Sequence, residues 1–195
     1  MAIDPSKFNL SNVVDTCAVW HIISSNSLYH RAKGARCEFC ITSFVHYECL
    51  IKPRGAKTEK DEQLMDRLRD AQKKRQFIPY ALDIEDLQEV EILRKRRNLG
   101  KGELTSIAFA KKTNIAFVTD DQKARRLAAS ILEPKNVQTT PHLLSWLAFN
   151  GHVMDSDKDE IIEQHAFFGQ KLAPYFTAAF LEAMRCRSLI PRSDP

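Results

Sequence analysis

The stretch from Asn12 to Thr16 places a carboxylate directly after a short apolar run. Val13 and Val14 are typical of a buried strand, and the residues after Asp15 and Thr16 have helical spacing. An acid at such a junction lies at the carboxyl edge of an open α/β sheet, where the ligands of these sheets collect. An acid that only caps the next helix is the commoner explanation of one such stretch. The argument therefore depends on whether the pattern recurs.

Strand-like and helix-like segments alternate along the chain. Strands are expected at Asn12–Asp15, Glu38–Thr42, Phe77–Ala81, Ile115–Val118 and Asn136–Thr139. Helices are expected at Cys17–Asn26, Phe44–Ile51, Glu59–Arg75, Ile84–Arg97, Glu103–Lys112, 122–131, Thr140–Phe149, Asp157–Phe168 and Pro174–Cys186. The polar stretch Ser24–Gly34 is expected to be a loop, and Pro79 favours an edge position for its strand. This alternation predicts an α/β fold with a small parallel sheet of about four to five strands between helices.

Composition excludes several classes of protein. The chain has 195 residues and a formal net charge of +4, which suits an ordinary globular protein and permits nucleic-acid binding. It has no apolar run long enough to span a bilayer, and its first residues lack the pattern of a signal peptide. The 5 cysteines show no disulfide framework, so a reducing compartment and a cytoplasmic location are expected.

Acids recur at positions that the expected sheet brings to one edge. Glu48 lies in the helix after the second strand, Glu103 opens a helix behind a glycine pair, and Asp120 and Asp121 follow the fourth strand. Carboxylates crowded in this way repel one another and raise one another's pKa values. A hard divalent cation, Mg²⁺ or Mn²⁺, relieves the repulsion, and such a site suits phosphodiester hydrolysis.

These motifs, in this order and spacing, resemble the PIN-domain family of metal-dependent nucleases, to which the VapC-type toxin ribonucleases belong. The resemblance covers about Asn12 to Gly151 and rests on Val13-Val14-Asp15-Thr16, on the run from Ile41 to Leu50, on Gly100-Lys101-Gly102-Glu103-Leu104, and on the run from Phe117 to Arg125. It implies a small parallel sheet between helices and an activity that cuts RNA.

Carried over by position, the resemblance assigns catalysis to Asp15, Glu48, Glu103 and Asp121. It assigns metal binding to Asp15, Glu103 and the pair Asp120 and Asp121, of which either residue is a candidate ligand. Thr16 and Thr119 would support waters or carboxylates by hydrogen bonds. A phosphoaspartate receiver needs an acidic pair near the N-terminus and a haloacid-type phosphatase needs Asp-x-Asp there. Asp15-Thr16-Cys17 fits neither.

Basic residues flank the acids in sequence and are candidate phosphate contacts. They are Lys101, Lys123, Arg125 and Arg126, with the further run Arg94-Lys95-Arg96-Arg97; the alternative is a solvated face. The expected function is a metal-dependent endoribonuclease, with a toxin of a toxin–antitoxin or defence system as one role. The competing hypothesis is a catalytically silent PIN fold that binds RNA or serves as a scaffold.

One set of residues has the composition of a zinc site: Cys37, Cys40, His46 and Cys49. The residues between Cys40 and His46 read as a strand that turns into a helix, and Cys37 and Cys40 would point to opposite faces of a strand. Buried free cysteines are therefore the preferred interpretation.

The nuclease-like domain is expected to span residues 1–151 and a C-terminal helical extension residues 152–195. Two helices of the extension each carry an apolar stripe: Ile161, Ile162, His165 and Phe168 in one, and Phe176, Ala179, Phe180 and Ala183 in the other. Two short helices cannot bury such stripes against each other alone. We expect them to pack partly on the core and partly at an interface with a second copy of the chain or a partner such as an antitoxin.

Overall fold

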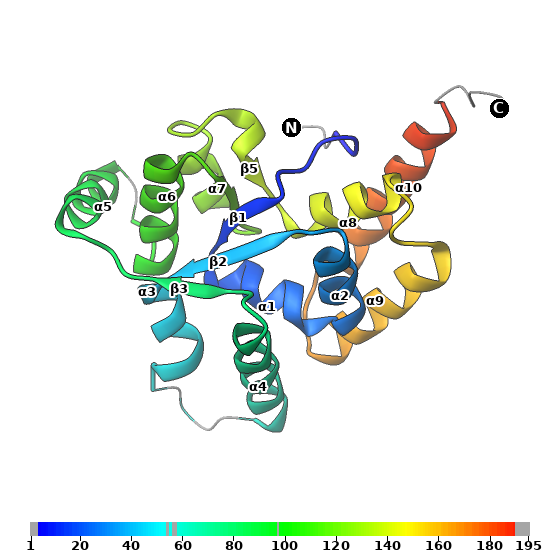
Figure 1. The fold of residues 1–195 in the computed structure, drawn as a ribbon, viewed down its shortest axis with the longest axis horizontal. Helices are drawn as coiled ribbons and strands as arrows, with labels where there is room; N and C mark the ends of the chain where they lie inside the picture. Colours follow the sequence, from blue (N-terminus) through cyan, green and yellow to red (C-terminus); the bar gives the residue numbers. More distant parts are fainter. Residues whose placement is uncertain (1–3, 54, 56–57, 97, 190–195) are drawn as a thin grey trace.

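A five-stranded parallel sheet forms the centre of the protein (Figure 1). The computed structural model of the chain describes residues 4–53, 55, 58–96 and 98–189. The strands are β1 (Ser11–Val14), β2 (Glu38–Thr42), β3 (Ile78–Tyr80), β4 (Ala116–Val118) and β5 (Val137–Gln138), in the order β3-β2-β1-β4-β5. Every neighbouring pair is parallel. The predicted fold class is confirmed, and Pro79 lies in an edge strand as expected.

Helices cover both faces of the sheet. One face carries α1 (Thr16–Ser24), α2 (Asn26–Gly34), α4 (Glu59–Lys73), α8 (Thr140–Phe149), α9 (Asp155–Phe167) and α10 (Ala173–Ser188). The other carries α5 (Ile84–Arg96), α6 (Lys101–Thr113) and α7 (Gln122–Ala128). The short α3 (Ser43–His46) and the π-helix η1 (Tyr47–Ile51) follow β2, and the 3₁₀-helix η2 (Pro134–Asn136) precedes β5. The expected helix to Arg97 ends at Arg96 within the described residues, and Arg97 lies outside them.

Alternation along the strands divides the core into two clusters. Val14 and Val118 face the cluster beneath α1 and α8, whereas Val13 and Phe117 face the cluster beneath α6 and α7. Each of these four side chains is 0% exposed. Because both faces of the sheet are covered, the strands read as short continuous apolar runs.

The predicted loop at Ser24–Gly34 is wrong, because most of this stretch is the helix α2. The Ser25 side chain caps the helix by accepting a hydrogen bond from the backbone N–H of Leu28, at 3.1 Å. Leu28, Tyr29 and Ala32 are buried on one side, at helical spacing. The polar residues of this helix lie on its outer, exposed face.

The C-terminal helices share the core of the sheet. Ile161, Phe168, Phe176 and Phe180 belong to the same cluster as Val14. A hydrogen bond of 2.9 Å from the Ser145 hydroxyl to the backbone carbonyl of Ala179 joins α8 to α10. The expected packing of these helices on the core is therefore observed.

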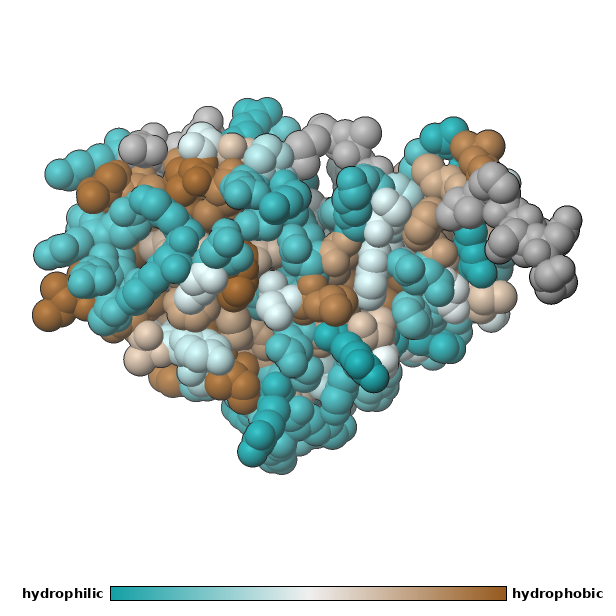
Figure 2. Space-filling model, turned by 45° about the horizontal axis from the view of Figure 1, so that its top comes forward, coloured by the Kyte–Doolittle hydropathy of each residue, from teal (hydrophilic) through white to brown (hydrophobic). Residues whose placement is uncertain are grey.

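The outer surface mixes polar and apolar side chains. Polar residues predominate on the face drawn in Figure 2, and apolar residues form several separate patches there. Among the helices that the structure describes, none combines the length and the apolar composition that a bilayer crossing requires.

Candidate functional site

The site is centred on Asp15, which follows β1 directly. The order of the strands reverses between β1 and β4, and such a reversal leaves a crevice at the carboxyl ends of the strands. One carboxylate oxygen of Asp15 accepts from the backbone N–H of Ala18 at 2.9 Å and from the Cys17 thiol at 3.0 Å. The other accepts from the Thr119 hydroxyl at 2.5 Å, across the sheet from β4. Asp15 therefore caps α1 and also joins the two central strands.

Burial strongly perturbs the Asp15 carboxyl. It is 1% exposed, and desolvation raises its pKa from 3.8 to about 7, although the hydrogen bonds from Thr119 and Cys17 oppose the shift. Strongly shifted carboxyl groups are concentrated at functional sites. A capping role alone does not require this degree of burial.

Glu48 reaches the same edge from η1. Its side chain accepts a hydrogen bond from the Thr16 hydroxyl at 2.5 Å, next to Asp15 in sequence. Gly102, at the start of α6, makes room for it: a Cβ atom there would lie 2.4 Å from the Glu48 Oε2 atom and 3.2 Å from the Thr16 Oγ1 atom. Single-turn π-helices are frequent at functional sites, and this one replaces the end of the expected α-helix.

Glu103 and Asp121 complete the acidic edge. Burial raises the pKa of Glu103, and the negative charges of Glu48 and Asp121 raise it further, so these three carboxylates lie within electrostatic reach of one another. Glu103 also bends back over Gly100, where a Cβ atom would lie 2.4 Å from its Oε2 atom. One Asp121 oxygen caps α7 by accepting from the backbone N–H of Ala124 at 2.7 Å.

The side chain of Asp120 points toward the start of α8. Its side chain accepts from the Thr140 hydroxyl at 2.5 Å and from the Thr140 backbone N–H at 3.0 Å. The His21 Nδ1 atom lies 2.7 Å from the same carboxylate. Asp120 thus joins α1 to the start of α8, whereas Asp121 remains on the side of Glu103.

His165, on α9, packs behind this pair. Its ring centroid is 5.4 Å from that of His21 and 4.9 Å from that of Phe176. His165 is 0% exposed, and neither ring nitrogen has a hydrogen-bond partner among the described residues. Burial, together with His21, lowers its pKa to about 4. Sequence reasoning did not identify His21 and placed His165 only in an apolar stripe, because only the fold brings α1, Asp120 and α9 together.

The chemistry of the donor set fits a hard cation. Asp15, Glu48, Glu103 and Asp121 offer carboxylate oxygens, and no Lys, Arg or His of the described residues forms an ion pair with Asp15, Glu103 or Asp121. Within the ranges that the structure describes, no three His, Cys, Asp or Glu side chains converge on one ion position. Mg²⁺ commonly takes only one or two protein carboxylates and keeps waters and phosphates as its other ligands, so the donor set is compatible with it.

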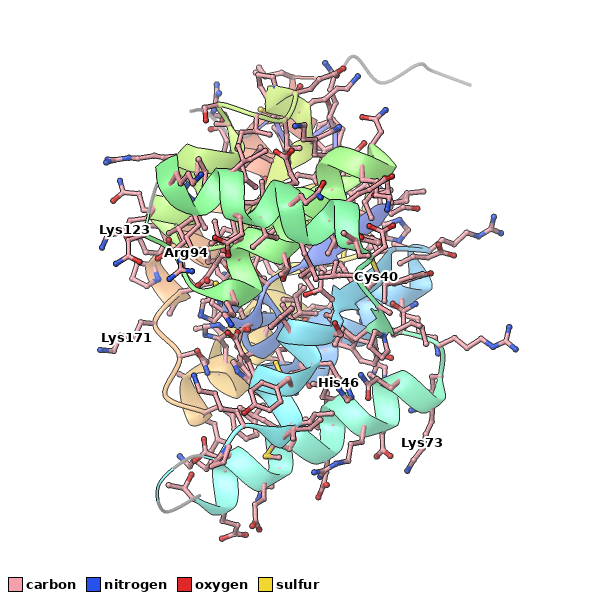
Figure 3. The ribbon with its side chains drawn as sticks, turned by 90° about the vertical axis from the view of Figure 1, so that its left-hand side faces the viewer. Cys40, His46, Lys73, Arg94, Lys123 and Lys171 are labelled. Carbon is pink, nitrogen blue, oxygen red and sulfur yellow. The ribbon has the colours of Figure 1, made fainter. Side chains whose placement is uncertain are left out.

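The cysteines of the proposed zinc set lie apart. Cys37 and Cys49 belong to one core cluster, and Cys40 packs against the other. Burial raises the pKa of the Cys37 and Cys40 thiols to about 12. Figure 3 shows Cys40 on the sheet and His46 on the segment after it. This placement fits core packing, as the sequence interpretation held.

The candidate phosphate-binding residues lie around the acidic edge. Lys101, in the first turn of α6, is exposed, and its Nζ atom is 5.6 Å from the Phe44 ring centroid. Lys123 and Arg126 are exposed on α7, and Figure 3 shows Lys123 directed outward. Arg125 is half-buried. Arg94 is exposed on α5, and Arg97 and the side chain of Arg96 lie outside the described part of the chain.

The protein thus has a small parallel α/β sheet, and several of its elements bring carboxylates to the strand switch. In proteins of this class, ligands bind at that edge of the sheet. A family model described as a PIN domain matches residues 13–156. The chain belongs to the PIN-domain family, whose members are generally nucleases. A search of curated proteins and a search of solved structures each return no match.

Proposed function

We propose that the protein is a divalent-metal-dependent endoribonuclease that hydrolyses phosphodiester bonds at the acidic edge. The observation that supports this proposal best is the placement of Asp15. Its carboxylate is buried at the strand switch, Glu48 bonds the neighbouring Thr16, and Glu103 lies within electrostatic reach of Glu48 and Asp121. Family membership supplies the nuclease class, and the chemistry of the donor set supports the cation.

The residues of the acidic edge would have different roles in the reaction. One or two of Asp15, Glu103 and Asp121 would hold the cation together with waters, and Glu48 would orient a ligand water from its position against Thr16 and Gly102. A bound divalent cation supplies the charge that activates an attacking water and stabilises the leaving oxygen. Thr119 holds the Asp15 carboxylate in place through its 2.5 Å hydrogen bond. Asp120 would have a positioning role, because its contacts are with His21 and Thr140.

Cations around the acids support RNA as the substrate. Lys101 lies in the same helical turn as Glu103, and Lys123, Arg125 and Arg126 lie on the helix that Asp121 caps. Cationic side chains so placed can track the phosphates of a bound strand. Because the sequence motifs resemble those of a family that includes toxin ribonucleases, we further propose that a partner protein restrains the activity by covering this edge.

The test compares cleavage of labelled single-stranded RNA by the purified full-length protein with Mg²⁺ or Mn²⁺ and with EDTA. We expect cleavage only with the cation, and none from Asp15→Asn or Asp121→Asn. Asp70→Asn, an exposed acid on α4, is the matched control and should cleave like the wild type. Full activity in EDTA, or in either site variant, would rule out the mechanism. Tight RNA binding without cleavage under any divalent cation would favour the silent binding protein.

A further inference from the structure

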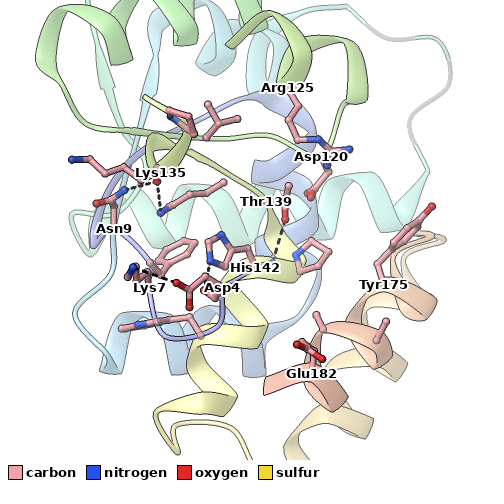
Figure 4. Close-up of a pocket in the computed structure, with 18 of the residues that line it drawn as sticks. Asp4, Lys7, Asn9, Asp120, Arg125, Lys135, Thr139, His142, Tyr175 and Glu182 are labelled. Carbon is pink, nitrogen blue, oxygen red and sulfur yellow. Dashed lines mark hydrogen bonds and ion pairs between the residues drawn. The ribbon is translucent and has the colours of Figure 1, made fainter. Parts of the chain in front are cut away.

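A groove lies on the β5 side of the sheet, between the start of α7, β5, the N-terminal segment and α10 (Figure 4). It encloses about 1290 Å³. Asp120 and Arg125 line the end that adjoins the acids, and Asn9 and Lys135 line the far part. The turn of Thr119, Asp120 and Asp121 joins the groove to the Asp15 site, because Thr119 bonds Asp15 and Asp120 lines the groove. The near end of the groove is therefore formed by Asp120, the residue next in sequence to the one whose hydroxyl bonds Asp15.

Two walls of the groove come from outside the part of the chain that matches the family. One wall is the N-terminal segment from Asp4 to Asn9, which is tied to the rest by hydrogen bonds. The backbone carbonyl of Asp4 lies 3.0 Å from His142 Nε2, and the Asn9 side chain donates to the Lys135 carbonyl at 3.0 Å. The other wall is α10, which begins after residue 156. The groove is thus a feature that these additions give to this chain.

Aromatic side chains line the groove at two places. Tyr175, in the first turn of α10, is 63% exposed and lies at the side of the opening. Phe8 and Trp146 pack together deeper in the groove, with ring centroids 5.7 Å apart. An exposed, rigid ring beside a nuclease site is a platform on which an unpaired base can stack, and this stacking tolerates any base.

One of the described cationic side chains that line the groove, Arg125, is available to bind a ligand. Among the described residues, the guanidinium of Arg125 has no hydrogen-bond or ion-pair partner. The acids of the groove are engaged: Asp120 with His21 and Thr140, Glu182 with Arg185 at 2.7 Å, and Asp4 with Lys7 at 3.4 Å. An available guanidinium one helical turn beyond Asp121 is placed to bind a phosphate.

We propose that this groove binds the single-stranded RNA that flanks the bond to be cut, with a base on Tyr175 and a backbone phosphate at Arg125. The inference rests on the proposed nuclease function and extends it to substrate selection. The closeness of Asp120 and Arg125 to the residue that bonds Asp15, together with an exposed ring and an available guanidinium in the groove, favours RNA over a peptide. A short RNA that covers only the acids would therefore bind more weakly than one that also fills the groove.

The experiment measures binding by fluorescence anisotropy with full-length protein in EDTA, on labelled single-stranded RNA of about 12 nucleotides. We expect Tyr175→Ala and Arg125→Gln each to weaken binding by about tenfold. Tyr80→Ala, at the β3 edge, and Lys74→Gln, at the end of α4, remove an exposed ring and an exposed cation elsewhere and should bind like the wild type. Photocrosslinking with 4-thiouridine beside the cleavage site should label the peptide that contains Tyr175.

The outcomes separate this inference from the proposed function. If the wild type cleaves RNA and the two groove variants bind it as tightly as the wild type, the groove does not hold RNA, and a polypeptide becomes its better occupant. Crosslinks confined to other peptides would overturn the inference in the same way. If the wild type neither binds nor cuts RNA, both the proposed function and the inference about the groove fail. Weakened binding in both groove variants, with unchanged controls, supports the inference.

Discussion

At the scale of single residues, the acids cap helices and also have features that capping does not require. Asp15 caps α1 and Asp121 caps α7, which is what isolated acids at these positions usually do. The burial of Asp15 and the mutual repulsion around Glu103 go beyond capping. A cap can therefore also be a site residue where the sheet brings several helix starts together.

Asp15→Asn should stabilise the metal-free protein at neutral pH and above. The pKa of Asp15 is raised from 3.8 in the unfolded chain to about 7 in the folded protein. The unfolded chain therefore releases this proton first, and the free energy of unfolding falls as pH rises between the two values. The gain of the variant should approach zero below about pH 4 and reach up to about 4 kcal/mol above pH 7. Urea unfolding at several pH values with EDTA measures it. An equal effect at all pH values would show that the burial of charge is not the cause.

Gly102→Ala should lower RNA cleavage by about tenfold to a hundredfold while the protein stays folded. The added methyl group would displace the carboxylate of Glu48, a flexible side chain, and break its bond to Thr16. Gly34→Ala is the control, since no atom lies within 4 Å of the added Cβ. Cleavage rates and melting temperatures of both variants check this. If Gly102→Ala cleaves RNA like the wild type, Glu48 takes no part in cleavage.

At the scale of elements, α7 tests how the chain binds phosphate. It presents Arg125 to the groove and Arg126 to solvent. Replacing both with Ala should weaken RNA binding and flatten its dependence on salt, by roughly one unit of slope for each lost phosphate contact. Titrations at several salt concentrations, with each single variant in parallel, measure the slope. No change in slope would mean that both residues serve only as a solvated face.

The strands could be predicted from the sequence because short apolar runs are local signals, and Asp15 and Asp121 stand just after two of them. Glu48 and Glu103 lie in helical segments, so their assignment depended on the order and spacing of the motifs. The helix α2 was missed because its polar face dominates its composition, although Ser25 before Leu28, Tyr29 and Ala32 has the spacing of a capped helix. The contact of His21 with Asp120 joins residues far apart in the chain, and the groove depends on how α10 packs. Neither has a local signal.

At the scale of the whole molecule, the C-terminal helices are part of the fold. Ile161, Phe168, Phe176 and Phe180 are each less than 10% exposed and belong to the same cluster as Val14. Burial of such side chains contributes roughly 1.5–3 kcal/mol each, against a net stability of about 5–15 kcal/mol for a domain. The extension therefore cannot be treated as an optional addition to the nuclease-like part.

Truncation after Gly151 should accordingly abolish cooperative unfolding. Because the core is shared, the truncated chain should be collapsed or aggregated and should lack a stable acid site. Circular dichroism and size-exclusion chromatography of the truncated and full-length proteins decide the matter. A truncated protein with a sharp thermal transition and wild-type cleavage would contradict this expectation.

The buried ring of His165 makes the molecule sensitive to acid. Its folded pKa of about 4 lies below the ordinary 6.5, so the unfolded chain takes up the proton first and stability falls as pH drops from 6.5 to 4. The ring lies between His21 of α1 and Phe176 of α10, so protonation should loosen α9 from these two helices before the rest unfolds. Hydrogen exchange at pH 5 should show opening in α9 that His165→Leu removes. Because α10 packs against α9 and forms one wall of the groove, that wall would lose part of its support in acid, and RNA affinity would fall with it.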